Sequence, residues 1–462
     1  MPAAYPDSYY AATADLLEPF PELEGEVTCD VCVVGAGYTG LNAALSLALT
    51  GFDVVILDAT RIAWAASGRN GGQVGSGQRL DQLKLEEMVG GNTAKKLWSV
   101  GEEAKAAVFG LIDKYAIDCD LKRGILHPAH KLEFAEEWQR YAEYLQANYD
   151  YADAEPLSED ALNERLGARK YYGGYADHGA GHLHPLKYAL GLTRALKRTG
   201  ARIFEESRIM RLRDQNAVEL DTLRGMVRAR FVLLAANTGL LDLDAHPRQH
   251  IMPIENYMLA TEPLDEATRK SLIRDDYAVA DSRFIVNYFR LAGDGRLIFG
   301  GGERYSPQAP RDTKRFVRRH MLKVFPQLRR TRIDYAWGGT VGITRHRLPY
   351  FQRISNNVLA AGGYSGQGVA MGTLGGQILA EAVQGVLERF DLLADLPKTA
   401  FPGGARLRHP LHVAGMIWFA MRDRLGSPLR RLRKQSKPAT ETAPDGPPGN
   451  GNGQPSLDGS QP

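Results

Sequence analysis

The chain has 462 residues, of which 44% are hydrophobic and 24% are charged, a composition that is ordinary for a soluble globular protein with two or three domains. Its net charge of +3 favours no class of charged partner, and no basic patch is interleaved with aromatic residues as in a nucleic-acid-binding module. The chain has only three cysteines and no signal peptide, which predicts a cytoplasmic protein without a nucleic-acid partner. No apolar run approaches the roughly 20 residues that span a membrane, so no transmembrane segment is predicted.

The first predicted element is a buried strand that leads through a glycine turn into a helix. Residues 30–40 read DVCVVGAGYTG, which is the dinucleotide-binding fingerprint in the strand–turn–helix context that it requires. Gly35 allows the tight turn, Gly37 lets backbone amides approach a pyrophosphate, and Gly40 lets the helix pack closely on the strand. Phosphates are favoured at the N-terminus of this helix by unpaired amides and the helix dipole. The residues predicted to bind the cofactor here are Gly35, Ala36, Gly37, Tyr38, Thr39 and Gly40.

The second predicted strand, residues 52–57, ends at an acidic residue. Asp58 follows Gly40 by eighteen positions, where a carboxylate can accept both ribose hydroxyls of a dinucleotide. A carboxylate repels a 2′-phosphate, so NADP is disfavoured, while NAD and FAD both remain open at this point. Cys29 and Cys32 form a C-x-x-C pair inside the first strand, and we interpret them as buried strand residues because a redox pair requires a helix N-terminus.

A loop of small residues and a long helical region follow Asp58. Residues 65–72 read AASGRNGG, which favours a loop whose backbone can approach a ligand closely. Residues 83–151 are predicted to be helical, 186–199 to form a helix, 201–205 a strand, and 227–236 a continuous apolar strand. The cofactor-binding residues predicted in these segments are Ser67, Gly68, Arg69, Asn70, Gly71, Gly72, Ala236 and Asn237.

From residue 250 to residue 335 the pattern changes to alternating β character. Two apolar strands, 284–290 and 296–300, flank the turn Gly293-Asp294-Gly295, which predicts a β-hairpin. Alternation places Tyr288 and Arg290 on the same face of this hairpin. We predict that these strands form an antiparallel sheet over a binding site.

A second glycine loop lies near the C-terminal end. A buried strand, 358–361, leads into the loop 362–368 and then into a helix, 369–387. A helix N-terminus at this place can stabilise the negative charge of a reduced flavin, so two glycine loops at opposite ends of the chain favour FAD. The cofactor-binding residues predicted in this loop are Gly363, Tyr364, Ser365, Gly366, Gln367 and Gly368.

These elements predict an α/β fold, in which a Rossmann-like FAD-binding domain of the glutathione-reductase type is interleaved with an antiparallel-sheet substrate domain. The FAD-binding domain is predicted over 1–82, 171–240 and 336–395, and the substrate domain over 83–170 and 241–335. Residues 396–434 form a predicted C-terminal extension, with a packed or surface helix at 413–421 and a basic, solvated edge at 422–437. The tail, 435–462, is rich in Pro, Gly, Asn and Ser and is predicted to be disordered.

Six segments resemble the FAD-dependent D-amino-acid and amine oxidase superfamily, and specifically its gamma-glutamylputrescine oxidoreductase branch. The resemblance covers nearly the whole chain except the tail. The matching segments are SYYAATA at 8–14, VVGAGYTG at 33–40, ASGRNGGQ at 66–73, YSG at 364–366, FPGG at 401–404 and RDRL at 422–425.

The resemblance implies an enzyme that binds FAD and moves a hydride from the carbon beside a substrate amine to the flavin. Water then hydrolyses the imine, which for gamma-glutamylputrescine gives an aldehyde and ammonia, and oxygen reoxidises the flavin with formation of H2O2. The alternatives are an amine dehydrogenase that uses another electron acceptor and a non-enzymatic FAD-binding protein. No residue is assigned as catalytic, no metal is expected, and the oligomeric state stays open.

The chain departs from the superfamily pattern at two places. Asp58 stands where Glu is more usual, and Gln367 stands where some relatives have His. Some members hold the flavin through a cysteine on the strand before the second cofactor segment, but residues 335–347 contain no cysteine. FAD is therefore expected to be non-covalent.

The candidates for substrate binding lie on the small-residue loop, the antiparallel strands and the second glycine loop: Arg69, Tyr257, Tyr288, Arg290, Trp337 and Tyr364. Arg290 can clamp a carboxylate bidentately, as a glutamyl end would require, and Trp337 is placed either in the pocket wall or in the core. His182 and His184 are interpreted as capping or packing residues at the start of a helix. His346 lies between two arginines, where like charge lowers the pKa of its imidazole.

Overall fold

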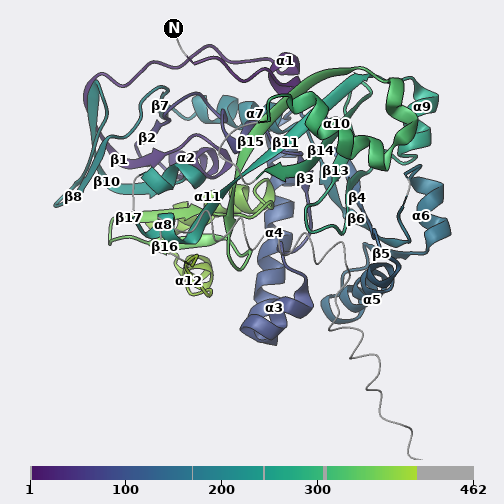
Figure 1. Cartoon of the computed structure of the whole chain (residues 1–462). Coiled ribbons are helices and arrows are strands. Elements are labelled where there is room, and N and C mark those ends of the chain that lie inside the picture. Colours follow the sequence, from purple (N-terminus) through teal and green to yellow (C-terminus); the bar gives the residue numbers. More distant parts are fainter. Residues whose placement is uncertain (1–2, 169, 243–244, 305–309, 403–462) are drawn as a thin grey trace, which may run out of the picture.

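Two β-sheets, with helices between and around them, form the frame of the molecule (Figure 1). The computed structural model describes residues 3–402 except for 169, 243–244 and 305–309. The predicted helix at 413–421, the basic edge at 422–437, the tail and the last two residues of the FPGG segment therefore lie outside the described residues. Within the described part of the chain, no helix is both long enough and apolar enough to cross a membrane.

The eight-stranded sheet contains the predicted nucleotide-binding strands. Five strands run parallel in the order β17-β10-β1-β2-β7, while β16 and the β8–β9 ribbon add antiparallel pairs. Its strands are β1 (Gly25–Val34), β2 (Val54–Leu57), β7 (Arg202–Phe204), β8 (Arg211–Asp214), β9 (Val218–Asp221), β10 (Gly225–Leu234), β16 (Tyr350–Arg353) and β17 (Val358–Gly362). Because parallel strands share a carboxyl edge, the loops after β1, β2, β10 and β17 meet there, and this edge is where such sheets bind ligands.

Helices α2 (Tyr38–Leu49), α7 (Pro185–Lys197) and α11 (Ala370–Val383) share one core with the parallel strands. Val33 and Ile56 point into this core, whereas Cys32 and Val55, one position away, belong to the core on the opposite face of the sheet. Cys29 and Cys32 are free thiols, and burial raises the pKa of both. They are strand residues, as predicted.

The nine-stranded sheet has the order β15-β11-β14-β13-β12-β4-β6-β3, with β5 beside β6. It is mostly antiparallel, and among the described strands of this sheet only β12 and β4 pair in parallel. Its strands are β3 (Gln73–Val74), β4 (Lys122–Pro128), β5 (Ala154–Leu157), β6 (Gly174–His182), β11 (Ile251–Pro263), β12 (Ala278–Ala280), β13 (Tyr288–Leu291), β14 (Arg296–Arg304) and β15 (Ile333–Thr344). The predicted antiparallel sheet and its hairpin are confirmed.

The remaining α-helices pack at several places: α10 lies on the face of the second sheet that carries Tyr257, α5 lies beside β5 and β6, and α12 lies against β16 of the first sheet (Figure 1). They are α1 (Tyr9–Thr13), α3 (Gln82–Val89), α4 (Gly91–Tyr115), α5 (Leu132–Tyr149), α6 (Glu159–Arg165), α8 (Ala245–His250), α9 (Glu266–Leu272), α10 (Thr313–Val324) and α12 (Glu388–Ala394). The short 3-10 helices are η1 (Ala66–Gly68), η2 (Asn237–Asp242) and η3 (Pro326–Arg330).

Three predicted elements have different limits in the structure. The helical region 83–151 is interrupted by β4, because this segment pairs with β6 and β12. The strand predicted from residue 284 begins at Tyr288, because the Asp281 carboxylate accepts the N–H groups of Arg283 and Asn287 and holds the segment before it as a loop. The helix predicted over 369–387 is α11, which ends at Val383, shortly before Gly385 adopts a positive φ of 89°.

The sheets cut across the predicted domain limits. β3, β6 and most of β15 fall within segments assigned to the FAD-binding domain, yet all three strands pair within the nine-stranded sheet. The domain limits stay a prediction, and sheet membership favours moving these three strands to the substrate domain.

Candidate active site

The turn after β1 is closely packed around its glycines. Gly35 has a φ of +103°, and a Cβ atom there would lie 2.9 Å from the Cα atom of Ala236. A Cβ atom at Gly40 would lie 1.8 Å from the carbonyl oxygen of Gly35, so α2 packs directly on the turn. Gly37 is the N-cap of α2, and its N–H has no protein partner among the described residues. The turn thus presents a free amide and a helix N-terminus to an anionic group.

Asp58 stabilises this turn by a hydrogen bond to its backbone. Its carboxylate accepts the N–H of Ala36 at 2.7 Å, the N–H of Thr60 at 2.8 Å and the hydroxyl of Thr60 at 3.1 Å. Burial raises the pKa of Asp58, and these three hydrogen bonds act in the opposite direction. An ionised carboxylate has about four acceptor positions, so one remains for a ribose hydroxyl rather than the two that the sequence suggested. Ribose binding by Asp58 stays a prediction.

The small-residue loop is fixed by a set of hydrogen bonds around Asn70. The Asn70 amide donates to the carbonyls of Ala66 and Ser67, both at 3.0 Å, and its Oδ1 atom accepts the N–H of Gly72 at 2.8 Å. Tyr38 of α2 donates its hydroxyl to the Ser67 carbonyl at 2.6 Å, and the Ser67 hydroxyl accepts the N–H of Tyr38. The loop and the fingerprint helix are therefore one rigid unit.

The second glycine loop has three residues with left-handed backbone. Gly363, Ser365 and Gly366 have φ values of +63°, +54° and +105°. Asn237, itself at a φ of +48°, accepts the N–H of Gly363 on its Oδ1 atom at 2.9 Å. A non-glycine residue at positive φ is strained, and the hydrogen bond from Thr344 N–H to the Ser365 hydroxyl helps to hold it.

The two glycine loops come together through their helices. The hydroxyls of Thr39 in α2 and Tyr364 in the second loop lie 2.7 Å apart. A Cβ atom at Gly376 would lie 2.2 Å from the carbonyl oxygen of Thr39, so α11 crosses α2 in direct contact. The Tyr364 side chain is buried in this joint, which favours a linking role over the predicted substrate contact.

One row of side chains crosses the nine-stranded sheet on the face toward the glycine loops. Tyr288 lies against Gly71, where an added Cβ atom would be 2.8 Å from its ring, and the Trp337 indole donates to the carbonyl of Arg69 at 3.1 Å. The strand registers extend this row across the sheet. This inner row consists of Trp337, Met258, Gly300, Tyr288, Ala280, His127 and Tyr175. His127 and Tyr175 were missed because no local pattern in their strands shows that they face the glycine loops.

Tyr257 lies on the other face of the same sheet. Its ring packs edge-on against Phe316 of α10 at a centroid distance of 5.7 Å, and it belongs to the core that contains Phe289 and Phe299. This orientation disfavours the predicted contact between Tyr257 and a substrate.

Arg290 is buried and bound by the protein. Its Nε atom donates to the carbonyl of Gly71 at 3.0 Å, Nη1 to the carbonyl of Leu291 at 3.3 Å, and Nη2 to the hydroxyl of Tyr10 at 3.4 Å. Tyr288 and Arg290 both face the loop, in line with the predicted alternation. The guanidinium is used to hold that loop, which disfavours the predicted carboxylate clamp.

Arg69 keeps one donor without a protein partner. Its Nε atom donates to the carbonyl of Trp64 at 2.6 Å and its Nη1 atom to the carbonyl of Gly338 at 3.3 Å, and the guanidinium lies 3.9 Å from the centroid of the Trp64 ring. The Nη2 atom is buried and has no partner among the described residues. Because a buried unpaired donor is costly, it marks a position that the acceptor of a ligand would fill.

The other polar candidates have structural contacts. His184 caps α7 by accepting the N–H of Lys187, which confirms its interpretation, and His182 bonds to the carbonyl of Asp276 at 2.9 Å. Gln367 lies beside Gly75, where a Cβ atom would be 3.3 Å from its amide. The pKa of His346 is lowered, first by burial and then by Arg345.

His127 gives the unfolding free energy a pH dependence. Burial lowers the pKa of this imidazole from 6.5 to about 4, so between these values the unfolded chain binds a proton that the folded chain does not. We expect stability to fall as the pH is lowered from 6.5 toward 4, and expect His127→Phe to make this fall shallower. Denaturant unfolding at pH 7.0 and 5.0 gives the change in unfolding free energy between these pH values. An equal change in the wild type and in His127→Phe would contradict the prediction.

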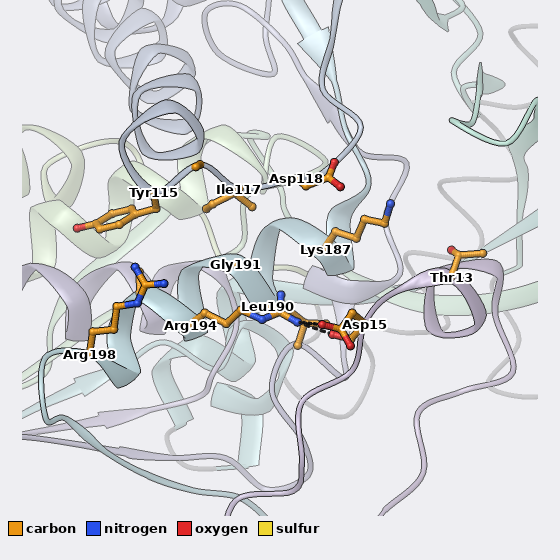
Figure 2. Close-up of a pocket in the computed structure, with 12 residues that line it drawn as sticks. Thr13, Asp15, Tyr115, Ile117, Asp118, Lys187, Leu190, Gly191, Arg194 and Arg198 are labelled. Carbon is orange, nitrogen blue, oxygen red and sulfur yellow. Dashed lines mark hydrogen bonds and ion pairs between the residues drawn. The ribbon is translucent and has the colours of Figure 1, made fainter.

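A surface cavity of about 490 Å³ lies elsewhere, between the end of α4 and helix α7 (Figure 2). Two of its cations are already paired, since Arg194 bonds to Asp15 at 2.7 Å and Lys187 bonds to Asp120 at 3.1 Å. None of its lining residues belongs to the glycine loops or to the inner row. We therefore place the active site at the carboxyl edge of the parallel sheet.

Comparison with known proteins identifies the family. The family model described as FAD dependent oxidoreductase matches residues 30–382. The chain belongs to this FAD-dependent oxidoreductase family. It is an enzyme of the amine or amino-acid oxidoreductase class, and FAD is its cofactor.

Several relatives cover most of this FAD-dependent oxidoreductase. Gamma-glutamylputrescine oxidoreductase of Escherichia coli K12 is 39% identical over 91% of this chain and 98% of that protein. A probable oxidoreductase, OrdL, of Rhizobium meliloti is 37% identical over 90% and 97%. Among solved structures, glycine oxidase from Geobacillus kaustophilus has a TM-score of 0.68 at 19% identity and covers 81% of this chain and 99% of that one. The structural likeness confirms the predicted fold.

The residues present fit FAD. The unpartnered Gly37 amide and the α2 N-terminus suit its pyrophosphate, and the glycine-lined turn leaves no Cβ atom in the way. The buried Nη2 atom of Arg69 offers a donor that the protein does not use. Gly363 to Gly368 lead into α11, whose N-terminus favours negative charge.

Proposed function

We propose that this enzyme oxidises gamma-glutamylputrescine at the carbon that bears its primary amine. The C–N bond becomes an imine, water hydrolyses the imine to an aldehyde and ammonia, and oxygen as final acceptor is reduced to H2O2. The observation that carries this proposal is the 39% identity to gamma-glutamylputrescine oxidoreductase over 98% of that protein.

The chain's own residues supply binding and orientation. Bound FAD supplies the hydride acceptor. The α2 turn and Asp58 hold the nucleotide, while Asn70 and Tyr38 keep the small-residue loop rigid. Tyr288 and Trp337 of the inner row close over this loop and exclude water, and the substrate must reach them as a neutral amine. No residue is assigned as a general base.

Anaerobic mixing of the purified yellow enzyme with gamma-glutamylputrescine, putrescine, sarcosine and a set of D-amino acids tests the proposal. We expect selective bleaching of the flavin bands by gamma-glutamylputrescine, and recovery with H2O2 formation when air is admitted. Selective bleaching by another amine would replace the substrate. Bleaching without recovery in air would replace oxygen by another acceptor.

The contacts of Arg290 lead to a distinct expectation for substrate choice. Arg290→Ala removes the bonds to Gly71 and Tyr10 and leaves buried acceptors unpaired, so we expect a loss of about 3 kcal/mol in stability. Because the loop is affected as a whole, kcat/KM should fall by the same factor for gamma-glutamylputrescine and putrescine. Steady-state kinetics with both amines check this. A loss confined to the glutamyl substrate would restore the carboxylate clamp.

A further inference from the structure

The inner row ends in a cluster of aromatic side chains. His127 of β4 and Tyr175 of β6 stack with ring centroids 4.4 Å apart and an interplanar angle of 14°. Trp138 of α5 meets both rings edge-on at 5.7 Å, and Tyr141 meets Tyr175 edge-on at 6.1 Å. Aromatic faces and edges from three elements therefore converge at the end of the row that lies farthest from Trp337.

A buried carboxylate lies next to this cluster. Asp177 is two positions from Tyr175 on β6, on the same face, and it is 3% exposed. Its Oδ1 atom accepts the N–H of Ala180 at 3.1 Å and the hydroxyl of Tyr151 at 2.5 Å, whereas Oδ2 has no protein partner in the described part of the chain. The charge of Asp177 acts on the pKa of His127, Tyr141 and Tyr175, which places it near all three rings.

Asp177 forms no ion pair with a cation in the part of the chain that the structure describes. Lys105 is the nearby cation, but its ammonium donates to Ser76 at 2.8 Å and to Tyr151 at 3.0 Å and pairs with Glu102 at 2.7 Å. No cationic group lies within ion-pair distance of Asp177 among the described residues. A buried carboxylate beside aromatic rings is the environment that an ammonium group prefers.

A guanidinium lies against the second glycine loop and near enough to the aromatic cluster for its charge to act on it. The Nε and Cδ atoms of Arg79 lie 3.8 and 3.9 Å from the position of a Cβ atom at Gly366, so the side chain covers the second glycine loop. Burial lowers the pKa of His127 and raises that of Tyr175, and the positive charge of Arg79 acts to lower both. The charges of Arg79 and Asp177 thus both act on the stacked pair, and the charge of Asp81 acts on Tyr175 as well.

We propose that Arg79, His127, Tyr141, Tyr175 and Asp177 form a head subsite that binds the zwitterionic end of an elongated amine substrate, with its α-ammonium on Asp177 and its α-carboxylate on Arg79. The inference rests on the proposed function, since a gamma-glutamyl group carries both charges. A plain diamine would satisfy Asp177 but offer no carboxylate to Arg79.

The spacing of the sheet suits such a substrate. From Tyr288, which lies at the small-residue loop, the inner row crosses Ala280 to reach His127. Two strand spacings amount to about 10 Å. The extended chain from the oxidised carbon of gamma-glutamylputrescine to its glutamyl α-carbon also spans about 10 Å. The reacting end and the head can therefore occupy the two parts of the row together.

Calorimetric titration of the FAD-loaded enzyme with two ligands that cannot be oxidised tests the head subsite. Gamma-glutamyl-n-butylamide keeps the head and the chain but lacks the terminal amine, and N-acetyl-n-butylamine lacks the head as well. We expect the first to bind more tightly than the second. Arg79→Met and Asp177→Asn should each weaken the first by about 10- to 100-fold and leave the second unchanged.

Two further variants separate charge recognition from structural damage. Tyr151→Phe breaks the bond to Asp177 but keeps its charge, and Arg198→Met removes an arginine that lines the separate surface cavity at α7, so both should keep the preference for the head. Arg79 is exposed, so its variant carries the test even if Asp177→Asn does not fold.

Equal binding of the two ligands by the wild-type enzyme, or equal losses for both ligands in Arg79→Met, would overturn the subsite. These results do not depend on turnover. Failure of gamma-glutamylputrescine to bleach the flavin would count against the proposed function alone, because binding of the head is measured separately.

Discussion

Gly37→Val should yield a folded protein without bound FAD. The backbone of Gly37, with φ of −87° and ψ of −170°, is open to any residue, so the substitution adds little strain. The new side chain would instead begin 2.8 Å from the Ser67 hydroxyl and lie where the free amide faces the cofactor. Loss of the pyrophosphate contacts should raise the dissociation constant of FAD by about 100-fold or more. The ratio of visible to 280 nm absorbance after gel filtration measures this.

A glycine in open space provides the control. Gly110 lies within α4, and a Cβ atom added there would meet no neighbouring atom within 4 Å, so Gly110→Val should retain FAD in full. Circular dichroism of both variants checks that they fold. A fully yellow Gly37→Val protein would contradict the assignment of the first turn as the pyrophosphate site.

Arg69→Met should lower the rate of flavin reduction by about 100-fold while most of the FAD stays bound. The substitution removes the buried Nη2 donor that has no protein partner among the described residues, and a fixed donor in a site without water contributes about 3 kcal/mol to a reaction that develops charge nearby. The bonds to Trp64 and Gly338 are lost as well, so the loop should also become less stable. Anaerobic stopped-flow measurement at 450 nm gives the rate.

The conservative variant separates charge from geometry at this position. Arg69→Lys keeps the charge but cannot bond to the two carbonyls and present a third donor in the same plane, so we expect it to regain only a small part of the rate. Full activity in Arg69→Lys would show that the charge alone matters, and an unchanged rate in Arg69→Met would remove Arg69 from the site.

Local patterns predicted the strand–turn–helix structure of the fingerprint segment correctly. The fingerprint turn depends on residues within one strand–turn–helix unit, so the glycine spacing and Asp58 could be placed from the sequence. The joint between Thr39 and Tyr364 could not be placed, because it connects residues 325 positions apart. The same holds for Arg290, whose partner Tyr10 belongs to the N-terminal segment.

The residues that face the substrate were harder to predict from the sequence, for a related reason. Alternation tells which residues of a strand share a face, but it does not tell which face meets the cofactor. Tyr288 and Tyr257 were therefore both expected over the binding site, although the register turns Tyr257 toward α10. His127 and Tyr175 lie on strands whose partners are far apart in the sequence, and no local pattern marks them.

The crossing of α2 and α11 has a consequence for the order in which the protein can be made. A ribosome that adds about 5 to 20 residues per second needs roughly 15 to 65 s to travel the 325 positions between Thr39 and Tyr364. During that time the N-terminal half already contains the fingerprint turn, but α11, which packs against α2, has not yet been synthesised. Flavin capture should therefore be a late event, and a nascent chain that stops before α11 should emerge colourless.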